Sequence, residues 1–113
     1  MGSGALRAFK AEFFKALAHP LRIGILELLS GGERSVLELQ RALDAEQPVV
    51  SQQLAVLRAK NIVRARKDGT TVYYALGDPE IRALLAAARR IFNNQLIGTR
   101  SMLRELAREQ RSR

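Results

Sequence analysis

The sequence predicts an α+β domain that is mainly helical and carries one β-hairpin. Two observations lead to this fold class. Apolar residues recur every three or four positions over most of the chain, which is the period of an amphipathic helix. Between residues 62 and 76 the pattern changes to two short runs of β-branched and aromatic residues, joined by Asp68-Gly69, a typical hairpin signal.

Length and composition indicate one globular domain. The chain has 113 residues, of which 47% are hydrophobic and 27% are charged. A chain of this size has room for a single core, and it gains stability by sharing apolar surface with a second copy. We expect one domain over residues 5–110, with flexible ends at residues 1–4 and 111–113.

The charge balance favours a polyanionic partner. Nineteen Lys and Arg against eleven Asp and Glu give a net charge of +8. Such a charge attracts nucleic acid first and an anionic membrane surface second. No apolar run approaches the ~18 residues of a membrane span, and the N-terminus has no signal-peptide pattern. We therefore predict a cytoplasmic protein with no membrane contact.

The first two helices are predicted from apolar spacing and from a capping signal between them. In residues 5–17 an apolar face is formed by Leu6, Phe9, Phe13 and Leu17. His19 then suits the cap of a second helix and Pro20 its first position, while Gly31-Gly32 ends that helix.

Two shorter helices follow. Ser35 and Glu38 have the spacing of a capping box, in which each side chain bonds the other's backbone N–H, and they begin a helix over residues 35–43. After a short link, a fourth helix is predicted over residues 47–60, with a proline near its start.

The hairpin and a long last helix complete the chain. The predicted strands are residues 62–67 and 70–76, with Val72, Tyr74 and Leu76 toward the core and Thr71 and Tyr73 outward. Asp78-Pro79-Glu80 then starts a helix whose apolar stripe continues almost to the C-terminus. We expect this helix to be bent or broken near Gly98.

Three helices followed by a hairpin are the parts of a winged helix-turn-helix. Residues 16–29 (ALAHPLRIGILELL), 36–43 (VLELQRAL) and 47–76 (QPVVSQQLAVLRAKNIVRARKDGTTVYYAL) resemble the ArsR–SmtB family of bacterial regulators. The likeness spans about residues 9–76, and its most telling segment runs from VSQQL to VYYAL. The resemblance implies a dimeric regulator of transcription that binds double-stranded DNA, and repression is the usual mode of the family.

The fourth helix has one side suited to the core and another suited to DNA. Val50, Leu54 and Leu57 cluster on one side. The opposite side is centred on Gln52, whose amide can pair with the N6 and N7 atoms of adenine in the major groove. No charged residue occurs in positions 47–57, which argues against an ordinary solvent-exposed face.

Cations of the hairpin suit phosphates or the minor groove, where they position a protein without reading sequence. Arg58 and Lys60, at the end of the fourth helix, also favour the helix dipole, so part of their role is structural. The complete set of predicted DNA-binding residues is Gln47, Pro48, Ser51, Gln52, Gln53, Arg58, Lys60, Arg64, Arg66, Lys67, Thr70 and Thr71.

Two positions depart from the family pattern. Glu46 stands where a small hydroxyl residue often begins the fourth helix, which weakens the cap and places a negative charge near DNA. Asn61 stands where glycine is frequent after that helix. Because Asn tolerates the left-handed conformation, we expect the helix to stop there nonetheless.

The first and last helices are the predicted homodimer interface. Their apolar stripes can pack in a bundle between subunits, or they can belong to the core of one chain. The interface residues are Phe9, Phe13, Leu17, Leu85, Phe92 and Leu96. The arginines between residues 100 and 113 can contact DNA flanks, a partner or only water.

Sensing in this family often uses a metal bound by cysteines, or by His and Asp of the last helix. The chain has no cysteine, and its last helix has no histidine. We therefore predict no metal site and no cofactor, although a weak site of His19 with Glu12, Asp44 or Glu109 across a dimer stays open. A small organic effector, a partner protein or no signal at all are the remaining alternatives.

No catalytic residues are predicted, because the chain lacks cysteine, has one histidine, and contains no phosphate-binding glycine loop or paired-carboxylate motif. We predict that the protein is not an enzyme. The alternative function is a winged-helix protein-interaction subunit of a two-component regulator whose effector is sensed by a partner protein.

Overall fold

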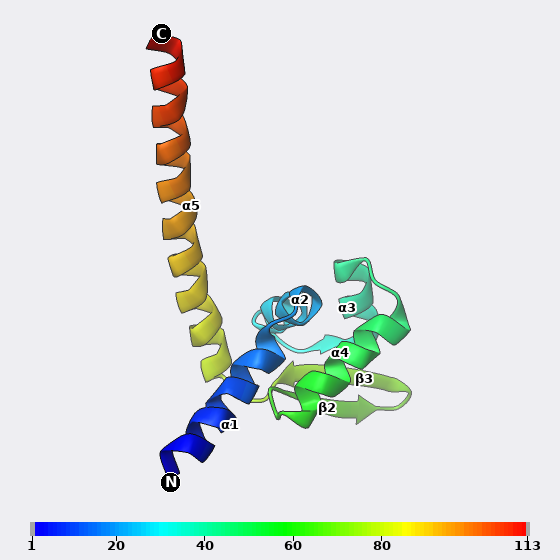
Figure 1. Cartoon of the computed structure of the whole chain (residues 1–113). Helices are drawn as coiled ribbons and strands as arrows, with labels where there is room; N and C mark the ends of the chain where they lie inside the picture. Colours follow the sequence, from blue (N-terminus) through cyan, green and yellow to red (C-terminus); the bar gives the residue numbers. More distant parts are fainter. Residues whose placement is uncertain (1, 113) are drawn as a thin grey trace. The chain divides into compact units, whose positions relative to one another are not determined.

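The computed structural model describes the backbone of residues 2–112 and the side chains of residues 4–111, and Figure 1 shows the course of the chain. The chain forms two compact units, Met1–Arg82 and Ala83–Arg113. Of the predicted flexible ends, residues 1 and 113 lie outside the described residues, whereas residues 2–4, 111 and 112 are helical. No helix in the described part of the chain is both long and apolar enough to cross a membrane.

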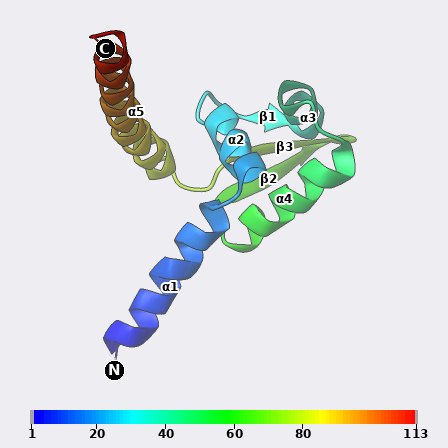
Figure 2. The ribbon, with the colours of Figure 1, turned by 45° about the horizontal axis from the view of Figure 1, so that its top comes forward.

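The first unit contains four helices and a small antiparallel sheet. The helices are α1 (Gly2–Leu17), α2 (Pro20–Leu29), α3 (Val36–Leu43) and α4 (Gln47–Ala59). The strands are β1 (Arg34–Ser35), β2 (Val63–Asp68) and β3 (Thr71–Leu76), in the order β1-β3-β2. Figure 2 shows α2, α3 and α4 beside this sheet. All four predicted helices and the hairpin are present, with α1 starting three residues before the predicted position.

Local side-chain bonds begin α2 and α3 as the sequence predicts. His19 Nδ1 accepts a hydrogen bond from the backbone N–H of Leu21 at 3.1 Å and so caps α2. At α3 the hydroxyl of Ser35 accepts from the N–H of Glu38, and the carboxylate of Glu38 accepts from the N–H of Ser35, both at 3.1 Å. This reciprocal pair satisfies two backbone donors that the first turn of a helix leaves open.

The core of the first unit lies between α2, α3, α4 and the sheet. Its fully buried side chains come from every one of these layers: Ile25, Leu26, Leu29, Leu39, Val50, Leu54, Leu57, Ile62 and Val63. Val50, Leu54 and Leu57, at 0% exposure, fix the rotation of α4 about its axis. Their burial determines which side of α4 faces solvent.

The hairpin loop is shifted by one residue from its predicted position. Asp68 pairs with Thr71, so the loop consists of Gly69 and Thr70. Gly69 adopts a positive φ of 63°, which glycine tolerates without steric cost. β1 is a third strand that the sequence pattern did not predict, and it pairs with β3 through Arg34–Tyr74 and Ser35–Tyr73.

Helix α5 (Glu80–Ser112) begins in the first unit and forms the described part of the second. It is one uninterrupted helix of 33 residues, so the predicted break near Gly98 is wrong. A single glycine lowers helix propensity but keeps its backbone N–H and C=O, and no proline removes a hydrogen bond nearby. The large apolar side chains of α5 from Ile91 to Leu106 are all 54–66% exposed.

Candidate nucleic-acid interface

The exposed side of α4 carries neutral polar groups. Gln52 is exposed, while Ser51 and Gln53 are half-buried beside it. Gln47 Nε2 donates a hydrogen bond to Ser51 Oγ at 3.1 Å, one helical turn away. This bond orients the first turn of the helix and leaves the amide oxygen of Gln47 and the hydroxyl proton of Ser51 available for further bonds.

The rest of this side of α4 is slim and uncharged. Pro48 and Ala55 are exposed, and Val49 and Val56 are 43% and 37% exposed. Small side chains allow a helix backbone to approach a surface closely, and an exposed valine can contact the methyl group of thymine. The exposed side of α4 is the side that the sequence predicts, and base reading by this side stays a prediction.

The two ends of α4 show the consequences of the two unusual residues. Glu46 is the N-cap, but its side chain makes no capping hydrogen bond. Asn61 has a φ of 60° and therefore ends the helix in the left-handed conformation, as predicted. Next to it, Lys60 Nζ lies 3.9 Å from Glu12 Oε2 of α1, so this predicted DNA contact also forms an exposed ion pair within the chain.

The cations of the hairpin differ in their surroundings. Arg64 and Lys67 are exposed on β2, and Thr70 and Thr71 are exposed at the loop. The strand alternation places Lys67 on the side of β2 opposite Arg64 and Arg66. The hairpin therefore presents basic groups on both sides of its tip.

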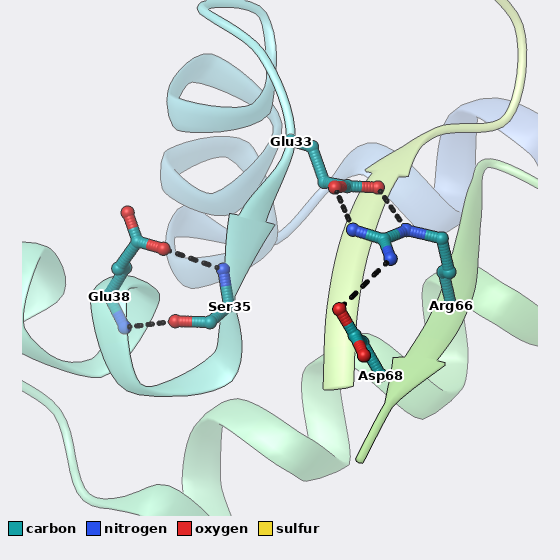
Figure 3. A network of polar contacts seen from close by, with 5 residues as sticks. All are labelled: Glu33, Ser35, Glu38, Arg66 and Asp68. Carbon is teal, nitrogen blue, oxygen red and sulfur yellow. Dashed lines mark hydrogen bonds and ion pairs between the residues drawn. The ribbon is translucent and has the colours of Figure 1, made fainter. Parts of the chain in front are cut away.

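Arg66 is held within the protein. As Figure 3 shows, its Nε and an Nη atom donate to the two carboxylate oxygens of Glu33 at 3.2 and 2.6 Å. Its other Nη atom lies 3.8 Å from Asp68 Oδ2, and the guanidinium lies over the Tyr73 ring at 4.7 Å from the ring centre. The hydrogen bonds from Arg66 lower the pKa of Glu33, and the same bonds raise the pKa of Arg66.

The Arg66 network was missed by sequence reasoning because its partners come from three segments. Glu33 precedes β1, and Tyr73 lies directly opposite Arg66 in the β2–β3 ladder. Arg66 is 54% exposed, so phosphate can reach it, but a phosphate has to compete with Glu33. The network also ties strand β2 of the wing to the loop before β1.

Among the described residues, no three His, Asp or Glu side chains form a group that could hold a metal ion. His19 uses Nδ1 for the α2 cap, and Glu12 contacts Lys60. The absence of a cofactor stays a prediction.

The predicted dimer residues are accessible within their own units. In the first unit Phe9 is 74% exposed, whereas Phe13 and Leu17 are half-buried. In the second unit Leu85 is half-buried, and Phe92 and Leu96 are 58% and 59% exposed. The interface itself stays a prediction.

A helix-turn-helix made by α3 and α4, followed by a β2–β3 wing, defines the class of winged helix-turn-helix proteins. Residues 19–65 match the bacterial regulatory protein, arsR family. The chain is 46% identical over 107 residues to the uncharacterized HTH-type transcriptional regulator Rv0081 of Mycobacterium tuberculosis, covering 94% of each protein. The chain belongs to the arsR family of bacterial regulatory proteins, as the sequence resemblance predicted.

Solved structures and a further relative agree with this assignment. The crystal structure of M. tuberculosis Rv0081 has a TM-score of 0.77 and 47% identity, covering 83% of this chain and 95% of that one. A homodimeric winged helix-turn-helix DNA-binding domain, Mb0332 of Mycobacterium bovis, has a TM-score of 0.76 and 32% identity, covering 83% and 87%. The biofilm growth-associated repressor of Agrobacterium fabrum is 42% identical over 73% of this chain and 70% of its own length.

Proposed function

We propose that this protein is a homodimeric repressor that binds a specific sequence of double-stranded DNA through α4 and the β2–β3 wing. It acts in the cytoplasm and is not an enzyme. The observation that carries the proposal is the neutral, glutamine-bearing side of α4, which the buried Val50, Leu54 and Leu57 turn toward solvent. Family membership supports the DNA-binding role, and the similar Agrobacterium protein, a repressor by name, supports the sign of regulation.

In this proposal Gln52 reads a base pair in the major groove. Its side chain is exposed at the centre of the slim side of α4, and a glutamine amide can donate to adenine N7 or accept from adenine N6. The Gln47–Ser51 hydrogen bond reduces the freedom of the neighbouring polar groups before DNA arrives. Bases are thus met by groups that are already oriented.

The wing supplies contacts that do not depend on sequence. Arg64 and Lys67 are the cations we assign to phosphates, assisted by the hydroxyl groups of Thr70 and Thr71. Arg66 has a double role, because it braces the wing through Glu33 in the free protein and reaches phosphate when DNA competes for it. Arg58 and Lys60 extend the basic edge from the end of α4.

Dimerisation completes the reading unit. The exposed apolar residues of α1 and α5 are costly in water, and a second copy that covers them removes this cost. The homodimeric state of the similar M. bovis domain supports this reading. A two-fold dimer presents two copies of α4 to half-sites about one helical turn of DNA apart.

Sensing is proposed to occur without thiolate metal ligands, because the chain has no cysteine. A small organic effector, a partner protein or no signal at all then remain, beside the weak metal site of His19 with carboxylates across a dimer.

The proposal is tested by binding to the DNA upstream of the protein's own gene, compared with a random duplex of equal length. Gln52→Ala should weaken binding to the specific fragment about 5- to 150-fold, since a good base contact contributes ~1–3 kcal/mol of discrimination. Binding to the random duplex should not change. Gln95→Ala, on α5, is the matched control and should leave both affinities intact.

If the wild-type protein shows no preference for any fragment of its own upstream region, the protein-interaction alternative replaces this proposal. An equal loss on both duplexes in Gln52→Ala would instead show that the reading side of α4 is wrongly assigned.

A further inference from the structure

The net positive charge of the chain is concentrated outside the winged unit. Residues 1–82 contain twelve Lys and Arg against nine Asp and Glu, a net charge of +3. Residues 83–113 contain seven Arg against two Glu, a net charge of +5. The smaller unit, which carries none of the twelve predicted DNA-binding residues, therefore holds the larger share of the +8.

These arginines follow one side of α5. At about 100° per residue, the six arginines of the described helix beyond residue 82 fall within an arc of about 100°. We call them the arginine stripe: Arg89, Arg90, Arg100, Arg104, Arg108 and Arg111. All six are exposed. Glu105 and Glu109 lie outside this arc, so the acidic residues do not interrupt the stripe.

The stripe is separate from the apolar side of the helix. The centre of the apolar side, marked by Leu85, Phe92, Leu96 and Leu103, lies about 90° around the helix from the centre of the arginine stripe. Similar apolar or small residues recur every 11 positions, at 81, 92 and 103 and again at 85, 96 and 107. An 11-residue repeat corresponds to ~3.67 residues per turn, close to the helical period, so both sides keep their direction along α5.

The composition of the stripe fits phosphate groups. Its cations are all arginine, whose planar guanidinium offers paired donors to phosphate oxygens and is weakly hydrated. From Arg100 to Arg111 an arginine occurs every three or four residues, a rise of about 5–6 Å between neighbours. Duplex DNA offers one negative charge per ~1.7 Å of its axis, so each arginine can find a phosphate.

We infer that the arginine stripe of α5 is a second DNA-binding surface, which binds the phosphate backbone of duplex DNA without reading sequence. This inference rests on the proposed function, because DNA is the polyanion that the winged unit is proposed to bind. An anionic membrane fits the observations less well. A helix that lies on lipid inserts its apolar side, and the dimer uses that side.

The stripe adds affinity for any duplex and steepens its salt dependence, since each phosphate contact releases condensed counterions. The winged unit then supplies the preference for one sequence. Arg111 Nε donates a hydrogen bond to the carbonyl of Ala107 at 3.3 Å, and the guanidinium has four further N–H donors.

The test uses the full-length protein and a random 30-base-pair duplex over a range of salt. The triple variant R100Q/R104Q/R111Q should bind at least about 10-fold more weakly at low salt, and its log–log salt slope should fall by about 2.7 per protomer for three lost contacts. The charge-keeping variant R100K/R104K/R111K should retain most of the slope. The matched control R7Q/K10Q/K15Q removes the same charge from exposed positions of α1 and should change the slope much less.

To locate the side of α5 that contacts DNA, a photo-crosslinking phenylalanine analogue is placed at one of two positions of the helix. Ile97, 60% exposed, lies within the arc of the stripe and should crosslink to the duplex, whereas Glu109 lies outside it and should not. Circular dichroism of each variant should show unchanged helicity, so that lost binding is not lost folding.

Equal effects of the α5 and α1 triple variants would overturn the inference, because net charge alone would then explain the loss. Binding to vesicles of phosphatidylserine and phosphatidylcholine that the α5 variant abolishes, with an unchanged DNA salt slope, would assign the stripe to lipid instead. The Gln52→Ala result does not depend on either of these outcomes, since it measures the preference for the specific duplex over the random one. Failure of the reading-helix proposal and failure of the stripe are thus distinguishable.

Discussion

Arg66 and Glu33 form a two-point ion pair between strand β2 and the loop before β1, with N–O distances of 3.2 and 2.6 Å. The pair places a carboxylate beside a cation of the wing that we propose contacts DNA phosphates. Both side chains are partly exposed, so the pair is accessible to competing phosphate. If Arg66 contacts DNA as we propose, Glu33 competes with the DNA backbone for it.

Glu33→Gln should strengthen binding to a random duplex, because Arg66 then loses its anionic partner. We expect the affinity for the random duplex to rise about 3- to 10-fold at low salt. The slope of log affinity against log salt concentration should become steeper by up to ~0.9 per protomer. The pKa of Glu33 is lowered by its bonds from Arg66, so the wild-type carboxylate stays ionised at neutral pH. As the pH falls through that lowered pKa, the wild-type protein should approach the variant.

Glu105→Gln provides the control for this substitution, since it removes the same charge from α5. Filter binding or fluorescence anisotropy over a salt series measures both variants. Identical salt slopes for the two would mean that the Arg66–Glu33 pair does not compete with DNA.

Ser35→Ala should destabilise the first unit by about 1 kcal/mol, because it removes the cap of α3. The lost hydrogen bond leaves the backbone N–H of Glu38 without its partner at a helix start. Urea unfolding followed by circular dichroism measures the change. Ser101→Ala, on the exposed surface of α5, should change the midpoint little.

The same capping box predicts a dependence on pH. The pKa of Glu38 is lowered, first by the hydrogen bond from the backbone N–H of Ser35 and then by the Ser35 hydroxyl. A lowered folded pKa means that ionised Glu38 contributes stability above its unfolded pKa, and that this contribution is lost as the pH falls through the folded value. The stability difference between wild type and Glu38→Gln should therefore shrink below about pH 4.3.

Local chemistry explains which parts of the fold were predictable. The His19 cap, the Ser35–Glu38 box and the left-handed Asn61 each depend on residues within three positions of one another. The buried side of α4 followed from a helical period that Val50, Leu54 and Leu57 obey. Because α4 can turn only one side to the core, its exposed polar side was predictable with it.

Features that depend on distant partners were not predictable. β1 has two residues and exists only because Arg34 and Ser35 pair with β3, about 40 positions later. The Arg66–Glu33 pair likewise joins residues 33 positions apart. The hairpin register was one residue off because Asp68-Gly69 and Gly69-Thr70 are both acceptable loop pairs, and cross-strand packing decides between them.

Gly77→Ala should be strongly destabilising, whereas Gly98→Ala should stabilise α5. A Cβ at Gly77 would overlap the carbonyl oxygen of Asn61, and the Gly77 N–H bonds Ile62 at 2.8 Å, so the backbone has little room to move. We expect a loss of about 1–3 kcal/mol, as for other forced overlaps in packed sites. At Gly98 a Cβ meets no atom within 4 Å, and alanine should add about 0.5–1 kcal/mol of helix stability.

Thermal unfolding of both glycine variants tests these opposite signs in one experiment. A stabilised Gly77→Ala protein would show that the contact between Asn61 and the residue after β3 does not constrain the end of α4. A destabilised Gly98→Ala protein would indicate that α5 bends at this position in the folded dimer.

Phe92→Asp should convert the protein to a monomer and remove specific DNA binding. Phe92 lies on the apolar side of α5 and is 58% exposed, so the substitution should change the folding stability of a single chain little. In a dimer the new carboxylate would be buried against apolar groups, which is costly for an unpaired charge. Sedimentation equilibrium and operator binding at the same protein concentrations measure both effects.

The matched control is Asn94→Asp, which adds the same charge two positions along α5, outside the arc of the arginine stripe and away from the apolar side. It should remain dimeric and bind the operator. If Phe92→Asp stays dimeric, the subunits pair through another surface, and the spacing of the two copies of α4 must be set elsewhere. If it becomes monomeric but keeps operator affinity, one copy of α4 and its wing suffice for recognition, and the two-half-site geometry has to be abandoned.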